Sequence, residues 1–253
     1  MAQRKARAKK PSATTQTLAG LRKELYALAD PVDAQFLQGF FKTGPGQYGA
    51  GDKFLGLRVP DLRRLVREYP ELEDSKALEM LGSPWHEERL LALLFLVRNY
   101  SRGDRSVRAK LHRAYLANTR YINNWDLVDA SAHYIVGQHL DAQNIGLLER
   151  LARSDDVWER RIAIVATFHF IRAGEFRPTL KIAKLLVDDP HDLIHKAVGW
   201  MLREVGKRDR KVEDAFLLRH FRKMPRTMLR SAIERHPERV RQQYLRRMLN
   251  SAG

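Results

Sequence analysis

The feature that most constrains the fold is a helical spacing of apolar residues, which short breaker segments interrupt along the whole chain. From about Thr15 onward, apolar residues recur every three or four positions, as in the stripe Leu18, Leu21, Leu25 and Leu28. No run alternates like a half-buried strand, and no Asn-Gly or Asp-Gly hairpin turn occurs. The sequence therefore predicts an all-α protein.

Proline and glycine recur at short intervals and divide the chain into about a dozen helices. The pattern predicts helices over 17–29, 33–42, 60–69, 75–81, 84–99, 105–119, 124–139, 143–153, 157–172, 176–187, 191–206, 210–222, 226–235 and 237–249.

Antiparallel helix pairs of this kind form either a bundle or a stacked solenoid. HEAT-type repeats take about 40 residues, so the ordered part would give roughly six antiparallel helix pairs. We predict an α-solenoid of HEAT-like repeats over 15–253, with a basic concave face that fits a nucleic-acid duplex. Residues 1–14 hold five cations and no acid, which predicts a disordered basic arm. The arm either contacts nucleic acid or serves as a solubilising tail.

Charge is the second constraint. The 253 residues include 46 Lys+Arg and 30 Asp+Glu, a formal net charge of +16, which makes a polyanion the expected partner. The chain has no cysteine, which excludes disulfides, thiolate-bound metal clusters and a thiol nucleophile. No targeting segment and no apolar run long enough to cross a bilayer is visible, so we expect a cytoplasmic, nucleoid-associated protein without a membrane partner.

Several motifs of other enzyme classes are absent or out of context. The glycine motif of Gly44–Gly49 follows a predicted helix rather than a strand, so it is not a dinucleotide site. His191 and His195 are four apart but lack a third ligand, and we interpret them as polar surface or interface residues. No phosphate loop and no Gly-x-Ser-x-Gly elbow occurs. We therefore expect neither a metal nor a cofactor.

Trp125 and Asp129 lie in the first turns of the predicted helix 124–139, four apart and on one face, and either Asn123 or Asn124 is a suitable N-cap. An indole beside a carboxylate can hold a sugar at the mouth of a groove. The alternative is a Trp buried between repeats and an Asp paired with a neighbouring Arg.

Three further positions carry a chemical signal. Arg161 lies on an apolar helix row and requires an anionic partner or a phosphate, whereas Arg160 points elsewhere as an ordinary surface charge. Trp200 lies within a basic row, off the apolar stripe of its helix, which suits a nucleic-acid groove or a tryptophan shared by two repeats. Gly199 indicates close packing at that point, because glycine costs a helix about 1 kcal/mol. The cations of the basic row are Lys196, Arg203 and Lys207.

The stretch 219–247 contains ten Lys/Arg and two Glu, a net charge of +8. Arg226 and Arg230 follow Pro225 at the predicted start of a helix, where arginines suit phosphate groups.

Four segments in register resemble the DNA alkylation repair family of AlkD-like HEAT-repeat DNA glycosylases, between about residues 35 and 240. These segments are Lys53–Arg63, Asn124–Asp129, Trp158–Arg161 and Lys196–Glu204. The resemblance implies a helical solenoid that wraps double-stranded DNA containing alkylated bases and removes N3- and N7-alkylated purines.

The same resemblance implies roles for individual residues. It makes Asp129 the catalytic aspartate, Trp125 and Trp200 the tryptophans that pack on sugar and backbone, and Arg161 the active-site arginine. Arg203 would contact the DNA backbone, and Tyr48 would be a third aromatic residue of the cleft.

The chemistry of such a site needs few groups. A purine alkylated at N3 or N7 is cationic and leaves as a neutral base, so a carboxylate near C1′ suffices to stabilise the sugar cation and direct water. We expect a monofunctional DNA glycosylase of base excision repair, which acts as a monomer and without base flipping, with Arg161 on a phosphate. The alternatives are a non-catalytic HEAT-repeat protein that binds branched or damaged DNA, and a protein scaffold.

Overall fold

The computed structural model describes residues 17–246, so the predicted arm 1–14 and the end of the predicted helix 237–249 lie outside the described residues. Within 17–246 every named element is a helix, and the two β-bridges, Lys53–Trp85 and Asp141–Asn144, are isolated. The prediction of an all-α fold is confirmed. None of the described helices is long and apolar enough to cross a membrane.

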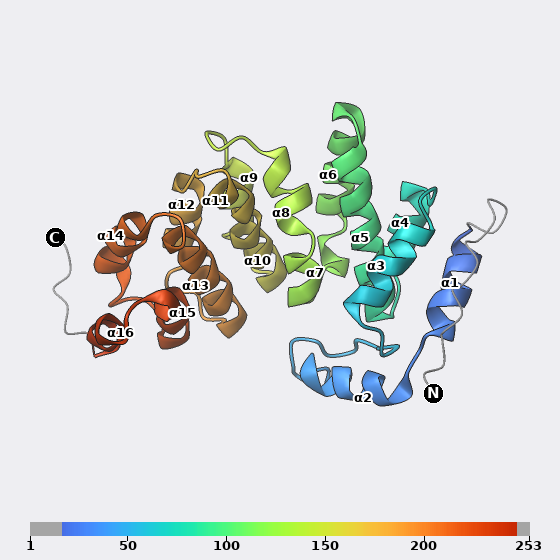
Figure 1. Ribbon diagram of the computed structural model, residues 1–253, viewed down its shortest axis with the longest axis horizontal. Coiled ribbons are helices and arrows are strands. Elements are labelled where there is room, and N and C mark those ends of the chain that lie inside the picture. Colours follow the sequence, from blue (N-terminus) through green and yellow to red (C-terminus); the bar gives the residue numbers. More distant parts are fainter. Residues whose placement is uncertain (1–16, 247–253) are drawn as a thin grey trace, which may run out of the picture. The chain divides into compact units, whose positions relative to one another are not determined.

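Figure 1 shows the order of the helices. They are α1 (Leu18–Ala27), α2 (Pro31–Phe40), α3 (Val59–Glu68), α4 (Asp74–Leu81), α5 (His86–Arg102), α6 (Arg105–Ala117), α7 (Trp125–Asp129), α8 (Ala132–Ile135), α9 (Gly146–Leu151), α10 (Val157–Ala166), α11 (Phe168–Arg172), α12 (Arg177–Leu185), α13 (Asp192–Gly206), α14 (Arg210–His220), α15 (Arg226–Ala232) and α16 (Glu238–Leu245), with 3-10 turns at η2 (Thr119–Tyr121), η3 (Gly137–His139) and η4 (Ile233–Arg235).

The chain forms two compact units that divide between Asn99 and Tyr100, within α5. The prediction of one continuous helical domain over 15–253 did not include this division.

Apolar stripes and the buried carboxylate of Glu87 help to hold the first unit together. Leu21 and Leu25 of α1 and Leu62 and Leu65 of α3 are fully buried, as their helical spacing requires. Glu87, also buried, accepts hydrogen bonds from three consecutive backbone N–H groups of the segment before α3, at 2.9, 2.8 and 3.2 Å. This carboxylate satisfies backbone donors that no helix or strand would satisfy.

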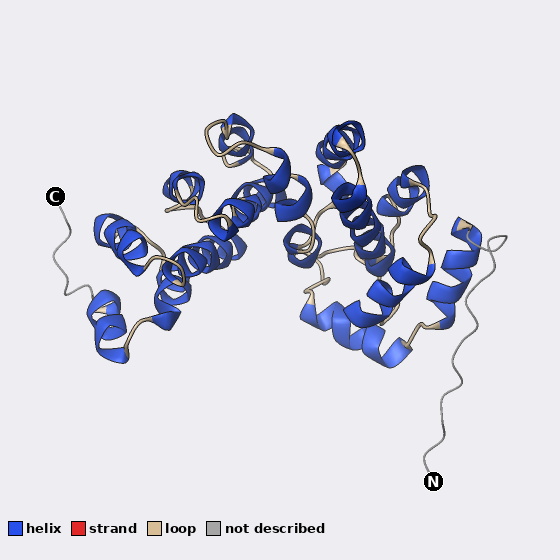
Figure 2. Ribbon diagram, turned by 45° about the horizontal axis from the view of Figure 1, so that its top comes forward, coloured by secondary structure: helices blue, strands red, loops and turns tan. Residues whose placement is uncertain are grey.

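The second unit contains two layers of helices. In one layer, α7 contacts α10, α10 contacts α13, and α13 contacts α15. Figure 2 shows the described chain as helices joined by loops. In the other layer, α9, α12 and α14 pack against α10 or α13. Helix pairs stacked in this way are the arrangement of an α-solenoid.

Two glycines allow the helices of this unit to approach closely. A Cβ at Gly199 of α13 would lie 2.5 Å from the carbonyl oxygen of Met228 and 2.6 Å from Cβ of Ser231, both on α15. A Cβ at Gly137 would collide with the carbonyl oxygen of Ala166 at the end of α10. The close packing expected at Gly199 is confirmed, and its partner is the backbone of α15.

Two helices predicted as continuous are broken. Within the segment 124–139, the first helix ends at Asp129. It ends there because the Ser131 hydroxyl donates to the Leu127 carbonyl at 2.6 Å, and because the Ser131 backbone, at φ −133°, is no longer helical. The segment 157–172 divides at Thr167, whose hydroxyl donates to the Ile164 carbonyl at 2.7 Å. Apolar spacing alone missed both breaks, since it continues through them.

Candidate functional site

The short helix α7 carries two of the predicted site residues. Its N-cap is the buried Asn124, whose Oδ1 accepts from the Trp125 backbone N–H at 2.8 Å. Leu127 and Val128 are fully buried and anchor the helix, which leaves Trp125 and Asp129 half-buried at its two ends. The helix thus holds a carboxylate and an indole at the boundary between core and solvent.

Asp129 is bound by Arg161 of α10 through two parallel hydrogen bonds. Arg161 Nε lies 3.0 Å from Asp129 Oδ1, and Arg161 Nη2 lies 2.8 Å from Asp129 Oδ2. The remaining guanidinium nitrogen, Nη1, donates to the Leu193 carbonyl of α13 at 2.6 Å. The anionic partner that the sequence requires for Arg161 is therefore Asp129, and the arginine connects α7, α10 and α13.

The two partners differ in exposure. The Arg161 side chain is 6% exposed, whereas the Asp129 side chain is 21% exposed. The guanidinium thus has little surface for a phosphate, while the carboxylate reaches solvent. Asp129 is therefore paired with a neighbouring Arg, as the alternative interpretation of the sequence expected, but its side chain is not completely buried.

Burial raises the pKa of the Asp129 carboxyl above its ordinary value, and the Arg161 guanidinium opposes that shift. Neutralising Asp129 would leave the buried Arg161 charge uncompensated, so Arg161 favours the ionised form of this carboxyl. Asp126, one turn earlier on α7, adds a like charge that also raises the pKa of Asp129. The site thus holds a carboxylate whose proton affinity is higher than usual.

A buried hydroxyl pair supports the end of α7, and sequence reasoning missed it. Ser131 donates to the Leu127 carbonyl, so its single proton is committed, and the Tyr115 hydroxyl, 3.0 Å away, donates to Ser131 Oγ. Both side chains are fully buried. A tyrosine and a serine on separate predicted helices gave no sequence signal for this contact.

Trp200 lies on α13, half-buried, with its ring 5.9 Å from that of Phe168. The Trp200 indole N–H and the Lys207 ammonium both bond to the Glu204 carboxylate. Burial would raise the pKa of Glu204, but these bonds outweigh burial and lower the pKa below its usual range. Trp125, Asp129, Arg161 and Trp200 therefore lie on α7, α10 and α13, three successive helices of one layer. Trp158, by contrast, is a buried core residue.

Comparison with known proteins identifies the family of the chain. A family model described as "DNA alkylation repair enzyme" matches residues 21–236. The chain belongs to this family. The resemblance found in the four sequence segments is confirmed at the level of the family, which gives the protein a role in the repair of alkylated DNA and DNA as its partner.

One solved structure supports the fold of this DNA alkylation repair family member. It is described as a predicted DNA alkylation repair enzyme from Enterococcus faecalis, and it superposes with a TM-score of 0.62. The similarity covers 83% of this chain and 97% of that chain, at 15% sequence identity. A search of curated proteins found no match.

The basic row that the sequence predicts on α13 of this repair protein is present, but each of its cations is paired. Lys196 Nζ lies 2.7 Å from Asp192 Oδ2, and Lys207 Nζ lies 2.5 Å from Glu204 Oε1. Arg203 pairs with Glu234 of η4. Lys196 and Lys207 are exposed and Arg203 is half-buried, so a phosphate would have to compete with these carboxylates.

The other predicted DNA contacts are more scattered. Arg226 and Arg230 are exposed on α15, and Arg226 Nη1 lies 3.4 Å from the Leu245 carbonyl. Tyr48 is half-buried in the turn segment between α2 and α3 of the first unit. Tyr48 therefore belongs to a different compact unit from the other predicted site residues.

Other sequence interpretations can be compared with the structure. The segment Gly44–Gly49 is a turn after a helix and has no strand before it. His191 caps α13 by accepting from the Leu193 N–H at 3.2 Å, and His195 contacts the Asp189 carbonyl. Across 17–246, no three His, Asp or Glu side chains are placed to hold a metal ion.

The expectation for Arg160 as an ordinary surface charge is wrong. Its Nε lies 2.7 Å from Asp189 Oδ2, and its Nη1 donates to the carbonyls of Ser154 and Asp155, both at 2.9 Å. The side chain is 14% exposed and thereby fixes the loop that precedes α10.

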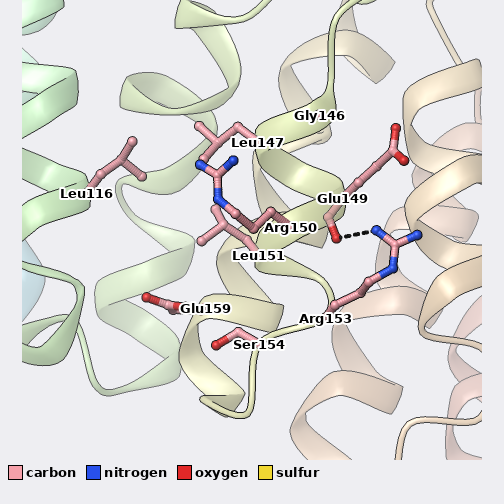
Figure 3. Close-up of a pocket in the computed structure, with 9 residues that line it drawn as sticks. All are labelled: Leu116, Gly146, Leu147, Glu149, Arg150, Leu151, Arg153, Ser154 and Glu159. Carbon is pink, nitrogen blue, oxygen red and sulfur yellow. Dashed lines mark hydrogen bonds between the residues drawn. The ribbon is translucent and has the colours of Figure 1, made fainter.

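A separate cavity of about 760 Å³ lies at α9, where Arg150 faces leucine side chains (Figure 3). Arg153, which also lines the cavity, donates to the backbone carbonyl of Glu149 at 2.9 Å. None of the predicted site residues lines it, so this cavity is not part of the candidate site.

Proposed function

We propose that the protein is a monofunctional DNA glycosylase that hydrolyses the N-glycosidic bond of cationic N3- and N7-alkylpurines in duplex DNA, without base flipping. The observation that carries this proposal is the partly exposed Asp129 carboxylate, fixed by two hydrogen bonds from a buried arginine. A fixed anion stabilises a developing positive charge without reorganising in the transition state.

The hydrogen bonds from Arg161 do not use all the acceptor sites of the Asp129 carboxylate. A carboxylate has about four lone-pair sites, and Arg161 occupies one on each oxygen. The remaining sites can accept a proton of the attacking water while the negative charge faces the sugar at C1′. Because the alkylated base leaves uncharged, no general acid is required.

The neighbouring residues have supporting roles in this proposal. Trp125 and Trp200, both half-buried, offer apolar faces that pack against deoxyribose and limit water. Arg161 acts as a positioning residue for Asp129 rather than as a phosphate contact, because its guanidinium is buried and bonded to Asp129 and Leu193. DNA backbone contacts fall to Lys196, Arg203, Lys207, Arg226 and Arg230 on the basic concave face that the sequence predicts, and Tyr48 would contribute a further aromatic contact.

A second candidate function has one observation in its favour. Both oxygens of Asp129 already accept from Arg161, as they would in a purely structural ion pair. A non-catalytic protein that binds branched or damaged DNA would keep such a pair intact.

The test is release of 7-methylguanine from methylated duplex DNA by wild type, Asp129→Asn and Asp126→Asn. We expect Asp129→Asn to lose about 10²–10⁴-fold in single-turnover rate while its DNA affinity is retained. Asp126→Asn removes a carboxylate one turn away and should keep the rate. Tight binding of a DNA junction by wild type, with no base release, would establish the second candidate instead.

A further inference from the structure

The second unit has a groove between α12 and α14 that the proposed glycosylase function does not use. Both helices pack on α13, and between them lies a cavity of about 720 Å³. Every residue that lines it belongs to α12, its N-cap or α14. None belongs to α7, α10, α13 or α15, so the groove is separate from the candidate active site.

The floor of the groove is apolar. Phe176 and Leu180 on the α12 side are half-buried, and Phe216 on the α14 side is buried beneath the groove. The Phe216 ring also packs against His220, with ring centres 4.5 Å apart. Such a floor can accept two or three aliphatic side chains of a partner.

The rim is basic, and no acidic residue lines the cavity. Lys181 pairs with Glu149 at 2.5 Å, but Lys184 and Arg219 are exposed and form no ion pair with any residue of 17–246. Burial and the charges of Lys184, Lys223 and Arg219 lower the pKa of His220. Lys184 and Arg219 thus lie near His220 without an acidic partner, which leaves a positive potential over an apolar floor.

We propose that the α12–α14 groove is a docking site for an acidic amphipathic helix of a partner protein. Aliphatic residues at i, i+3 or i+4, and i+7 would enter the groove, and acidic residues beside them would face Lys184 and Arg219. A phosphate backbone would engage the cations but leave the apolar floor uncovered. The combination of floor and rim therefore favours a peptide over nucleic acid.

The probe is a labelled helical peptide of about 16 residues, with leucines on one face and Asp or Glu elsewhere, matched to the helix-in-groove pattern. We expect fluorescence anisotropy to show saturable binding that weakens with salt. Lys184→Glu with Arg219→Glu should raise the peptide Kd at least about tenfold, and so should Leu180→Gln. The matched control, Lys110→Glu with Arg239→Glu, reverses two exposed cations away from the groove and should leave the Kd unchanged.

Three outcomes would overturn the proposal. The first is no binding of the acidic peptide to wild type. The second is equal binding of a peptide with the same composition and scrambled leucines, which would show that charge alone acts. The third is displacement of the peptide by duplex DNA together with weaker DNA binding by the Lys184/Arg219 variant, which would make the groove a nucleic-acid contact. Asp129→Asn should bind the peptide like wild type, so this test is independent of the glycosylase proposal.

Discussion

Each compact unit contains an Asp carboxylate that is bound by its own buried arginine, and the surroundings of the two carboxylates differ. In the first unit, Asp52 Oδ1 lies 2.7 Å from Arg89 Nη2, and Asp52 Oδ2 lies 3.2 Å from His86 Nδ1. In the second unit, both oxygens of Asp129 accept from Arg161. The Asp52 side chain is 5% exposed and the Asp129 side chain is 21% exposed, so only Asp129 can meet a ligand.

The pKa values of the two carboxyls are also shifted in opposite directions. Burial would raise the pKa of Asp52, but the partners His86 and Arg89 outweigh it and lower the pKa. For Asp129 burial prevails and the pKa is raised. The comparison shows that an Asp–Arg pair is not itself a functional signature. Exposure and an elevated pKa distinguish the pair that could perform chemistry from the pair that holds the fold.

The largest expected effect is on stability, at Asp52. Asp52→Asn leaves the Arg89 charge buried without its counterion, so we expect the free energy of unfolding to fall by about 3–5 kcal/mol. Urea denaturation measures this loss. Base release per folded molecule should stay at the wild-type level, and a selective loss of activity would end the distinction between the two pairs.

The next effect is on catalysis, at Arg161. Arg161→Lys keeps the positive charge but replaces the two parallel hydrogen bonds to Asp129 by a contact from one ammonium group. Because the Asp129 carboxylate would then shift, we expect the rate of base release to fall about 100-fold. The loss should appear in kcat rather than in DNA affinity. Arg89→Lys is the matched change in the first unit and should lower the melting temperature with little change in kcat. Equal kinetic losses in both variants would contradict a special role for Arg161.

A smaller effect is expected from the hydroxyl pair behind α7. Ser131→Ala leaves the Leu127 carbonyl and the Tyr115 hydroxyl without their partner, which should cost about 2 kcal/mol of unfolding free energy. Because Asp129 ends the helix that Ser131 terminates, the release rate should fall several-fold as well. Ser83→Ala removes a hydroxyl that accepts from the Trp85 N–H in the first unit, and it should leave the rate unchanged. An unchanged rate in Ser131→Ala would remove Ser131 from the support of the site.

The smallest effect is a separation of two pH profiles. Asp52 has a lowered pKa in the folded state, so its stabilisation is complete above the ordinary value of 3.8 and is lost only as the pH falls below it. Asp129 must be ionised to act and has a raised pKa, so activity should decline while the pH is still above 3.8. Circular dichroism and base release, measured on the same samples, should therefore show folded but inactive protein in that window. If folding and base release were lost over the same pH range, the loss of activity at low pH could not be assigned to protonation of Asp129.

Much of the fold could be predicted because apolar spacing and breakers are local. The stripe Leu18, Leu21 and Leu25 is buried as expected, and most predicted helices lie within a few residues of the observed ones. The breaks at Ser131 and Thr167 could not be predicted, since a side-chain hydroxyl competes with the helix there only in a particular packing context. The division between Asn99 and Tyr100 had no sequence signal, because α5 runs through it.

By itself, the sequence determined the helical architecture, the positive charge and the set of residues that resembles a repair enzyme, because these depend on residue type and spacing. Only the tertiary structure decided that Arg161 binds Asp129, that Arg203 pairs with Glu234, and that Asp52 forms a closely related pair inside the first unit. The physical reason is that partner and exposure depend on residues far apart in the chain. A carboxylate's role depends on both, and no local pattern specifies them.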